Sequence, residues 1–267
     1  MEKNLTALGF MSGTSGDGVD TSVISSNGKD TINIKYNRFD PYPTSLSNKI
    51  HRVKESISEM QDLLKYSSEI DKLELEITDF HIDIAIKATK EVDYDLIGFH
   101  GHTIYHNSEE KISKQIGLGA NLSKLTNRDV VYNFRQNDIK NGGEGAPLSP
   151  IYHLALIKSL FNENKVKIPI SILNIGGIAN ITEIERDFKI TSRDIGPGNC
   201  LIDKWIRKNS DKFFDENGTL ADKGKTDKFI FDQYLDNYYY SKVNSKRSLD
   251  TNDFDVSFAK GLSLENG

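Results

Sequence analysis

Two glycine-rich segments of the chain could bring backbone N–H groups close to an anionic ligand. Residues 12–20 combine three glycines with three hydroxyl and two carboxylate side chains, and Gly176-Gly177 lies between two apolar runs. Glycine lacks a Cβ atom, so a ligand can approach its backbone closely, and a turn of exposed N–H groups favours an anion, phosphate above all. A tight turn without a ligand explains either segment alone equally well. Because the pattern occurs twice, we expect both turns to bind phosphate groups.

The first segment also offers oxygen ligands for a cation. Asp17 could hold Mg²⁺ through water, since this ion prefers oxygen ligands and keeps several waters. The segment is not a P-loop, because no Gly-Lys-Ser/Thr follows and the chain continues into an apolar run. The residues expected to contact the phosphates or the ion are Gly13, Thr14, Ser15, Gly16, Asp17, Gly18, Val19, Asp20, Gly176 and Gly177.

Three further residues suit acid–base chemistry or substrate binding. Asp138 follows a predicted strand and precedes a glycine-rich loop, where a carboxylate is well placed as a general base. Arg135 could hold a phosphate or a sugar hydroxyl, and His100, at the end of another strand, could hydrogen-bond a substrate. Surface-loop and structural roles stay open for all three. A metal site made of His100, His102 and His106 is less favoured, because no nearby cysteine or carboxylate completes a tetrahedral set.

The apolar spacing indicates which elements position these residues. Strands are predicted at Leu5–Met11, Val19–Ser25, Thr31–Phe39, Asp95–Phe99, Lys114–Leu118, Val130–Phe134, Ile170–Leu173 and Ile178–Ile184. Helices are predicted at Thr44–Asp62, Leu63–Val92 (as one or two helices), Asn121–Asn127, Ser149–Leu160, Cys200–Arg207 and Phe229–Tyr238. Each glycine-rich hairpin opens a three-stranded meander, which suggests a duplicated nucleotide-binding unit that faces a shared cleft. The polar stretch 162–167 is typical of a linker, so we expect domains at 1–164 and 165–267.

Composition narrows the class of protein. The net charge is −5, with both signs interspersed, which argues against a nucleic-acid surface. Cys200 is the only cysteine, so no internal disulfide can form, which suits a reducing compartment. No apolar run reaches the length that spans a membrane, and the N-terminus lacks the pattern of a signal peptide. We expect a cytosolic protein without nucleic-acid or membrane partners.

The ordered set of motifs resembles the anhydro-N-acetylmuramic acid kinases over essentially the whole chain. The matching segments, in order, are 10–20 (FMSGTSGDGVD), 100–103 (HGHT), 134–138 (FRQND), 142–148 (GGEGAPL), 174–182 (NIGGIANIT), 194–199 (DIGPGN), 214–218 (FDENG) and 249–254 (LDTNDF). The sequence departs from the family pattern at Gly16, where Leu or Met is usual, at His102, where Gln is usual, and at Asn133, where Asp is usual.

The resemblance implies an α/β fold of the sugar kinase/actin superfamily, with two ribonuclease-H-like domains around a cleft. It implies ATP and Mg²⁺ as cofactors and phosphorylation of O6 of 1,6-anhydro-N-acetylmuramic acid while water opens the anhydro bridge. The product would be N-acetylmuramic acid 6-phosphate, in cytoplasmic recycling of the cell wall. Asp138 would be the general base, and Arg135 and His100 would face the sugar.

Several expectations stay open at this stage. The family continues past Gly267, so we expect a C-terminally truncated chain with an incomplete second domain. The alternatives are a levoglucosan kinase, which would differ only in its sugar pocket, and a non-catalytic fragment that binds sugar or nucleotide. A homodimer is also open.

Overall fold

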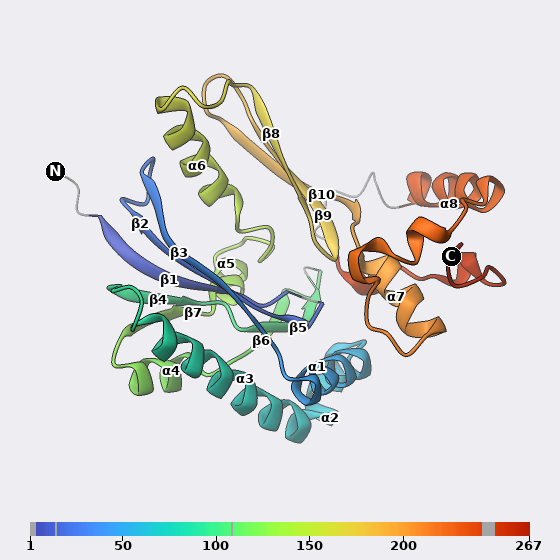
Figure 1. Ribbon diagram of the computed structural model, residues 1–267, viewed down its shortest axis with the longest axis horizontal. Helices are drawn as coiled ribbons and strands as arrows, with labels where there is room; N and C mark the ends of the chain where they lie inside the picture. Colours follow the sequence, from blue (N-terminus) through green and yellow to red (C-terminus); the bar gives the residue numbers. More distant parts are fainter. Residues whose placement is uncertain (1–3, 14, 108, 242–248) are drawn as a thin grey trace. The chain divides into compact units, whose positions relative to one another are not determined.

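The computed structural model describes residues 4–13, 15–107, 109–241 and 249–267 (Figure 1). The chain divides into two compact units, which are described separately. The first comprises Met1–Ile170 with Glu183–Thr191, and the second comprises Ser171–Thr182 with Ser192–Gly267. Both units contain helices and strands, so the protein is of the mixed α/β class. The predicted domain boundary after residue 164 stays a prediction.

A five-stranded mixed sheet forms the centre of the first unit. Its strands, in spatial order, are β3 (Ile32–Pro41), β2 (Gly18–Ser26), β1 (Leu5–Met11), β4 (Leu96–Phe99) and β7 (Asp129–Tyr132). The first three strands in the chain make an antiparallel meander, whereas β4 runs parallel to β1 and β7 parallel to β4. Because the carboxyl ends of β1, β4 and β7 point the same way, the segments that follow them emerge at one edge of the sheet.

Helices cover this sheet and complete the core. They are α1 (Thr44–Ser56), α2 (Met60–Lys65), α3 (Ser67–Ala88), α4 (Gly119–Thr126), α5 (Phe134–Lys140) and α6 (Pro150–Asn162). The long helix α3 packs against α1 and α4, and it lies along one face of the sheet with α4 (Figure 1). Leu8, Val23, Ile50, Ile77 and Ile97 are fully buried in one continuous cluster. Each such side chain contributes about 1.5–3 kcal/mol by leaving water.

The predicted helix over 44–62 is wrong at its C-terminal end. α1 ends at Ser56, and Ile57 has extended backbone angles. The Asp62 side chain accepts hydrogen bonds from the N–H groups of Ser58 (2.9 Å) and Glu59 (3.1 Å), and with Glu59 it forms a capping box that starts α2. The apolar spacing continues across this break, so spacing alone does not locate it.

The predicted strand over 130–134 is also wrong at its end. β7 stops at Tyr132, and Asn133 takes a left-handed conformation with φ of 61°. Phe134 then begins α5, which carries Asp138. Asp138 therefore lies on a helix, not in a loop directly after a strand. A two-stranded hairpin, β5 (His102–Asn107) and β6 (Ile112–Ile116), completes the first unit.

A second sheet has the order β10-β9-β8, with β8 at Ile170–Ile175, β9 at Ile178–Ile184 and β10 at Ile190–Pro197. The two-residue turn Gly176-Gly177 joins β8 to β9, a connection that only antiparallel strands allow. In the turn from β9 to β10, Phe188 packs edge-on against Phe161 of α6, with ring centroids 5.5 Å apart. This contact joins residues 183–191 to α6, which also belongs to the first unit.

In its described residues, the second unit also contains the helices α7 (Cys200–Asn209) and α8 (Lys228–Ser241) and four short 3-10 helices. The 3-10 helices span Glu216–Gly218, Ala221–Lys223, Thr251–Asp253 and Ser257–Ala259. Cys200 is buried in a cluster with Leu249 and Phe254, so it contributes to packing in the second unit. No helix in the described ranges of either unit is long and apolar enough to cross a membrane.

Candidate active site

The turn between β1 and β2 is the first of the two predicted phosphate-binding hairpins. The N–H of Gly16 donates to the carbonyl of Gly13 at 3.1 Å and closes the turn. The hydroxyl of Ser15 donates to Oδ1 of Asp17 at 2.6 Å, and Asp17 is exposed. From α1, the hydroxyl of Ser47 donates to the Gly16 carbonyl at 2.7 Å. The turn is thus closed within itself and tied to a helix.

Glycine is required at two positions of this hairpin. Gly16 has a φ of +63°, which side chains rarely adopt, and a Cβ at Gly18 would lie 2.5 Å from the carbonyl oxygen of Asp40. Val19 is fully buried, and its exposed fraction of 0% includes the backbone. The predicted contact Thr14 lies outside the described residues.

The carboxylates of the first hairpin suit a divalent cation. Partial burial, and after it the negative charge of Asp17, raises the pKa of Asp20 above its usual range. The two carboxylates are therefore close enough to repel each other, and a bound cation would relieve this repulsion. Among the described residues there is no group of three His, Cys, Asp or Glu side chains arranged to hold a metal ion. A Mg²⁺ held by Asp17 would thus rely on water and phosphate oxygens for its remaining ligands.

Ser12, at the entry to the first hairpin, hydrogen-bonds two buried side chains. Its Oγ lies 2.8 Å from the hydroxyl of Tyr42 and 2.8 Å from Nδ1 of His102. The Tyr42 N–H also donates to the carbonyl of Asp17 at 2.9 Å. We refer to Ser12, Tyr42 and His102 as the Ser12 network. It fixes the entry side of the hairpin, and Tyr42 also fixes its exit.

The loop that follows α5 holds Asp138 through backbone hydrogen bonds. The N–H of Gly145 donates to Oδ2 of Asp138 at 2.8 Å, and the N–H of Gly143 donates to the Asp138 carbonyl at 3.0 Å. The Asp138 side chain is half-buried. One oxygen of the carboxylate is thereby oriented by the backbone, while a carboxylate retains acceptor capacity for a further group.

Gly145 also connects Asp138 to the other two candidate residues. Its carbonyl accepts from Nη1 of Arg135 at 3.4 Å, and Nε of Arg135 donates to Nε2 of His100 at 2.8 Å. Nδ1 of His100 lies 3.1 Å from the carbonyl of Gly101. Since Nε2 accepts a hydrogen bond, Nδ1 carries the proton and donates it. Burial, and after it the charge of Arg135, lowers the pKa of His100 to about 4, so its ring is neutral near pH 7.

The structure thus gathers His100, Arg135 and Asp138 into one cluster, which we call the Asp138 cluster. Their chemical roles stay predictions. The histidine metal site is not supported: His100 contacts Arg135, His102 contacts Ser12, and Nδ1 of His106 lies 3.0 Å from the hydroxyl of Ser113.

The second predicted hairpin is joined to the start of α7. The carbonyl of Gly177 accepts from the N–H groups of Gly198 (3.0 Å) and Cys200 (3.3 Å), and the carbonyl of Gly176 accepts from Asn199 (2.8 Å). A Cβ at Gly198 would lie 2.0 Å from the Gly176 oxygen, so this approach requires glycine. The N–H groups at the start of α7, which are an anion site in many proteins, here bind the turn.

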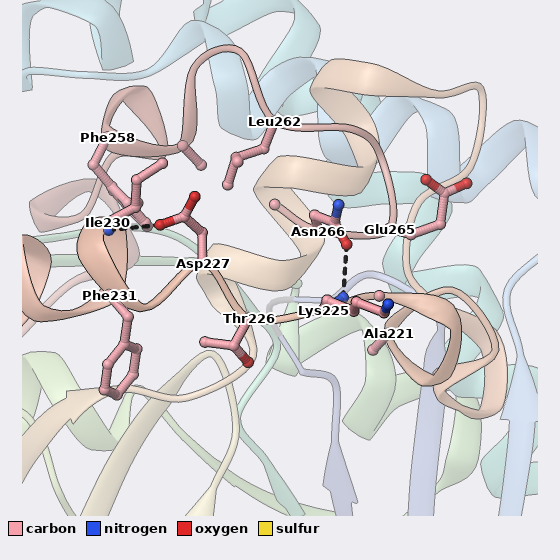
Figure 2. A pocket seen from close by; sticks show the side chains of 13 residues that line it. Ala221, Lys225, Thr226, Asp227, Ile230, Phe231, Phe258, Leu262, Glu265 and Asn266 are labelled. Atoms are coloured by element: carbon pink, nitrogen blue, oxygen red, sulfur yellow. Dashed lines mark hydrogen bonds between the residues drawn. The ribbon is translucent and has the colours of Figure 1, made fainter.

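A pocket of about 280 Å³ lies in the second unit, between the start of α8 and the segment 258–267 (Figure 2). Its lining includes Lys225, Asp227, Phe231 and Phe258, and the N–H of Lys225 donates to Oδ1 of Asn266 at 2.6 Å. None of its lining residues was predicted from the sequence as a site residue.

Comparison with known proteins identifies the family. The family model described as anhydro-N-acetylmuramic acid kinase matches residues 5–261. The chain belongs to the anhydro-N-acetylmuramic acid kinase family. The enzyme of that name from Pelagibacter ubique (strain HTCC1062) is 46% identical over 271 residues, which cover 100% of this chain and 71% of the relative.

Other anhydro-N-acetylmuramic acid kinases are more distant. Those of Rhizobium johnstonii and Agrobacterium fabrum are 37% and 35% identical over 268 residues, covering 98% and 96% of this chain and 71% of each relative. Membership of this family makes the chain a kinase, and a kinase family implies ATP as the phosphoryl donor. The resemblance seen in the sequence motifs is therefore confirmed.

Sequence reasoning missed most of the Ser12 network. Ser12 lies within the first glycine-rich segment, but Tyr42 lies 30 positions and His102 90 positions away in sequence. A signal for Tyr42 could have been its place between two prolines at the end of a strand, where the backbone is restricted. From the sequence, His102 is interpreted only as part of a histidine metal site and as a departure from the family pattern.

Proposed function

We propose that this kinase transfers the γ-phosphoryl group of ATP to O6 of 1,6-anhydro-N-acetylmuramic acid while water adds to C1. The bond between C1 and O6 breaks, the water oxygen bonds to C1, and O6 takes the phosphoryl group. The products are ADP and N-acetylmuramic acid 6-phosphate, an intermediate of peptidoglycan recycling. The family match over residues 5–261 carries this proposal, and the geometry of the Asp138 cluster supports the roles assigned below.

Asp138 is proposed as the general base that takes a proton from the attacking water. Its carboxylate is held on a helix and oriented by the Gly145 N–H at 2.8 Å. Half-burial leaves it accessible to a small molecule. Proton transfer to a positioned carboxylate of this kind accelerates reactions by about 10²–10⁴-fold.

Arg135 and His100 are proposed to hold the sugar. A guanidinium presents five N–H donors in a planar fork, a geometry that suits hydroxyl and carboxylate oxygens, and the Arg135 fork is oriented by His100 at 2.8 Å and Gly145 at 3.4 Å. His100 accepts from Arg135 and stays neutral, so the pair presents one positive charge. Such a fork orients a polar substrate more tightly than a single ammonium group would.

The two glycine hairpins are proposed to bind the phosphates of ATP. In the first, Gly13 to Asp20 would offer backbone N–H groups, and in the second the Gly176-Gly177 turn would do so. Asp17 would hold Mg²⁺, and the ion would supply positive charge that offsets the charge on the transferring phosphoryl group. Exposure of Asp17 and its proximity to Asp20 support this assignment.

We further propose that residues 1–164 and 165–267 are two ribonuclease-H-like domains around a cleft. The order β3-β2-β1-β4-β7, with an antiparallel meander followed by two parallel strands, supports this for the first domain. A cytoplasmic location, a homodimer and an incomplete second domain stay predictions.

A coupled assay of ADP release tests the proposed reaction. With ATP and Mg²⁺, we expect turnover of 1,6-anhydro-N-acetylmuramic acid at a kcat/KM at least tenfold above that of levoglucosan. In ¹⁸O-labelled water the product should carry the label at C1. Faster turnover of levoglucosan would support the alternative sugar kinase, which the names of the reported relatives do not favour. Calorimetric binding of both ligands without any ADP release would indicate a non-catalytic binding protein.

A further inference from the structure

The segment His100-Gly101-His102 contacts both parts of the candidate site in the first unit. Nδ1 of His102 lies 2.8 Å from Oγ of Ser12 in the first hairpin. Nε2 of His100 accepts from Arg135 of the Asp138 cluster at 2.8 Å. Two residues that are two positions apart in a chain are separated by at most about 7 Å between Cα atoms. The hairpin and the Asp138 cluster are therefore joined by one very short stretch of backbone.

This stretch has little freedom to adjust. Gly101 has a φ of +74°, and a Cβ there would lie 2.5 Å from the carbonyl oxygen of Ile116. Ser12 and His102 also form an isolated parallel bridge through their backbones. A displacement of the hairpin entry is thus transmitted to the backbone that carries His100.

The Ser12 network is buried, which makes its hydrogen bonds costly to break. The exposed fractions are 0% for His102, 5% for Ser12 and 6% for Tyr42. Burial, and after it the charge of Lys54, lowers the pKa of His102 to about 3, so the ring is neutral near pH 7. Nε2 of His102 has no hydrogen-bond partner among the described residues. Among the described residues, the hydrogen bond of the His102 ring is therefore the one with Ser12.

We propose that His102 is a positioning residue that couples the nucleotide-binding hairpin to the Asp138 cluster through Ser12. The proposal rests on the function proposed above. It assigns to His102 a role that needs no contact with the substrate: the ring sets the position of Ser12, and the same backbone sets the position of His100.

Four variants test the coupling: Ser12→Ala, His102→Leu, the double variant, and His102→Gln. Removing one partner of a buried hydrogen bond leaves the other unsatisfied, so each single variant is expected to raise the KM for ATP by about tenfold. The double variant should be no worse than Ser12→Ala, because both single variants remove the bond between Ser12 and His102 and Ser12→Ala also removes the bond to Tyr42. His102→Gln should recover most of the affinity, since an amide can bond to the Ser12 hydroxyl. Ser12→Ala should also raise the KM for the anhydrosugar, although Ser12 lies in the hairpin.

His106→Leu is the matched control. His106 is a buried histidine on the same strand as His102, and its Nδ1 bonds to Ser113 on β6. This variant should lower Tm without changing either KM. The proposal is overturned if the effects of Ser12→Ala and His102→Leu multiply in the double variant. A Ser12→Ala variant that changes the KM for ATP alone would overturn it as well.

Hydrogen exchange separates failure of this inference from failure of the proposed function. Without substrates, amides at 15–18 should exchange at least tenfold faster in His102→Leu than in the wild type or in His106→Leu. This readout needs no turnover, so it decides the coupling even if the substrate is a different sugar. Unchanged exchange at these amides would refute the role of His102.

Discussion

Gly143 leaves no room for a side chain beside the Asp138 carboxylate. In Gly143→Ala the new Cβ would lie 2.1 Å from Oδ2 and 2.5 Å from Cγ of Asp138, whereas ordinary contact begins at 3.4 Å. The carboxylate would have to move by about 1 Å, which breaks its 2.8 Å hydrogen bond from Gly145. A misplacement of about 1 Å costs about 100-fold in rate. We expect kcat for ADP release to fall by about this factor, with the KM for ATP unchanged.

Gly142→Ala provides the control for this prediction. A Cβ at Gly142 would meet nothing within 4 Å, although its φ of +94° makes the substitution strained. The control should therefore lose stability, about 1–3 kcal/mol by the usual cost of such backbone angles, and keep kcat within a few fold. Equal kcat values in the two variants would refute the claim that the position of Asp138 limits the reaction.

Three further perturbations test other parts of the site. Gly198→Ala places a Cβ 2.0 Å from the Gly176 oxygen and so should displace the Gly176-Gly177 turn. We expect ATP binding measured by calorimetry to weaken about tenfold, and an unchanged affinity would contradict the proposed role of this turn in ATP binding. Burial and then the charge of Arg135 lower the pKa of His100 to about 4, and Arg135→Met removes only the charge. The pKa of His100 should therefore rise in an NMR titration but stay below 6.5, and an unchanged pKa would contradict the effect of the Arg135 charge. Burial lowers the pKa of His81 from 6.5 to about 4. Its contribution to stability is complete above pH 6.5 and is lost as the pH falls toward 4, by about 2 kcal/mol at pH 5. In urea unfolding, His81→Phe should remove this pH-dependent loss of the free energy of unfolding. An unchanged pH dependence in the variant would refute the contribution of His81.

The sequence predicts elements well where an apolar run ends at a glycine-rich turn. Leu5–Met11 is such a run, and the predicted strand has the observed bounds. The strands predicted at Ile170–Leu173 and Ile178–Ile184 and the helix predicted at Cys200–Arg207 are found within two residues of these bounds.

The errors arise where one side chain or one backbone angle overrides the spacing. Asp62 starts a new helix by accepting hydrogen bonds from Ser58 and Glu59, although the apolar spacing continues through them. Asn133, in a left-handed conformation, ends β7 and places Asp138 on a helix. Neither event changes the pattern of apolar residues.

The candidate site could be predicted only in part, because its contacts are long-range. Residue types and the motif resemblance indicate Asp138, Arg135 and His100 as candidates. They do not show that Gly145 joins Asp138 to Arg135, nor that His102 faces Ser12. Such contacts depend on how β1, β4 and β7 align, which no local pattern encodes.

The kcat of Asp138→Asn tests most directly whether Asp138 is the base of the proposed reaction. Asparagine keeps an oxygen that can accept from Gly145, so the loop should stay in place, while the side chain can no longer take a proton. We expect ADP release with 1,6-anhydro-N-acetylmuramic acid to slow by about 10²–10⁴-fold, and Asn137→Ala, at the exposed neighbouring position on α5, to retain the wild-type rate. Turnover by Asp138→Asn at the wild-type rate would contradict the assignment of Asp138 as the general base.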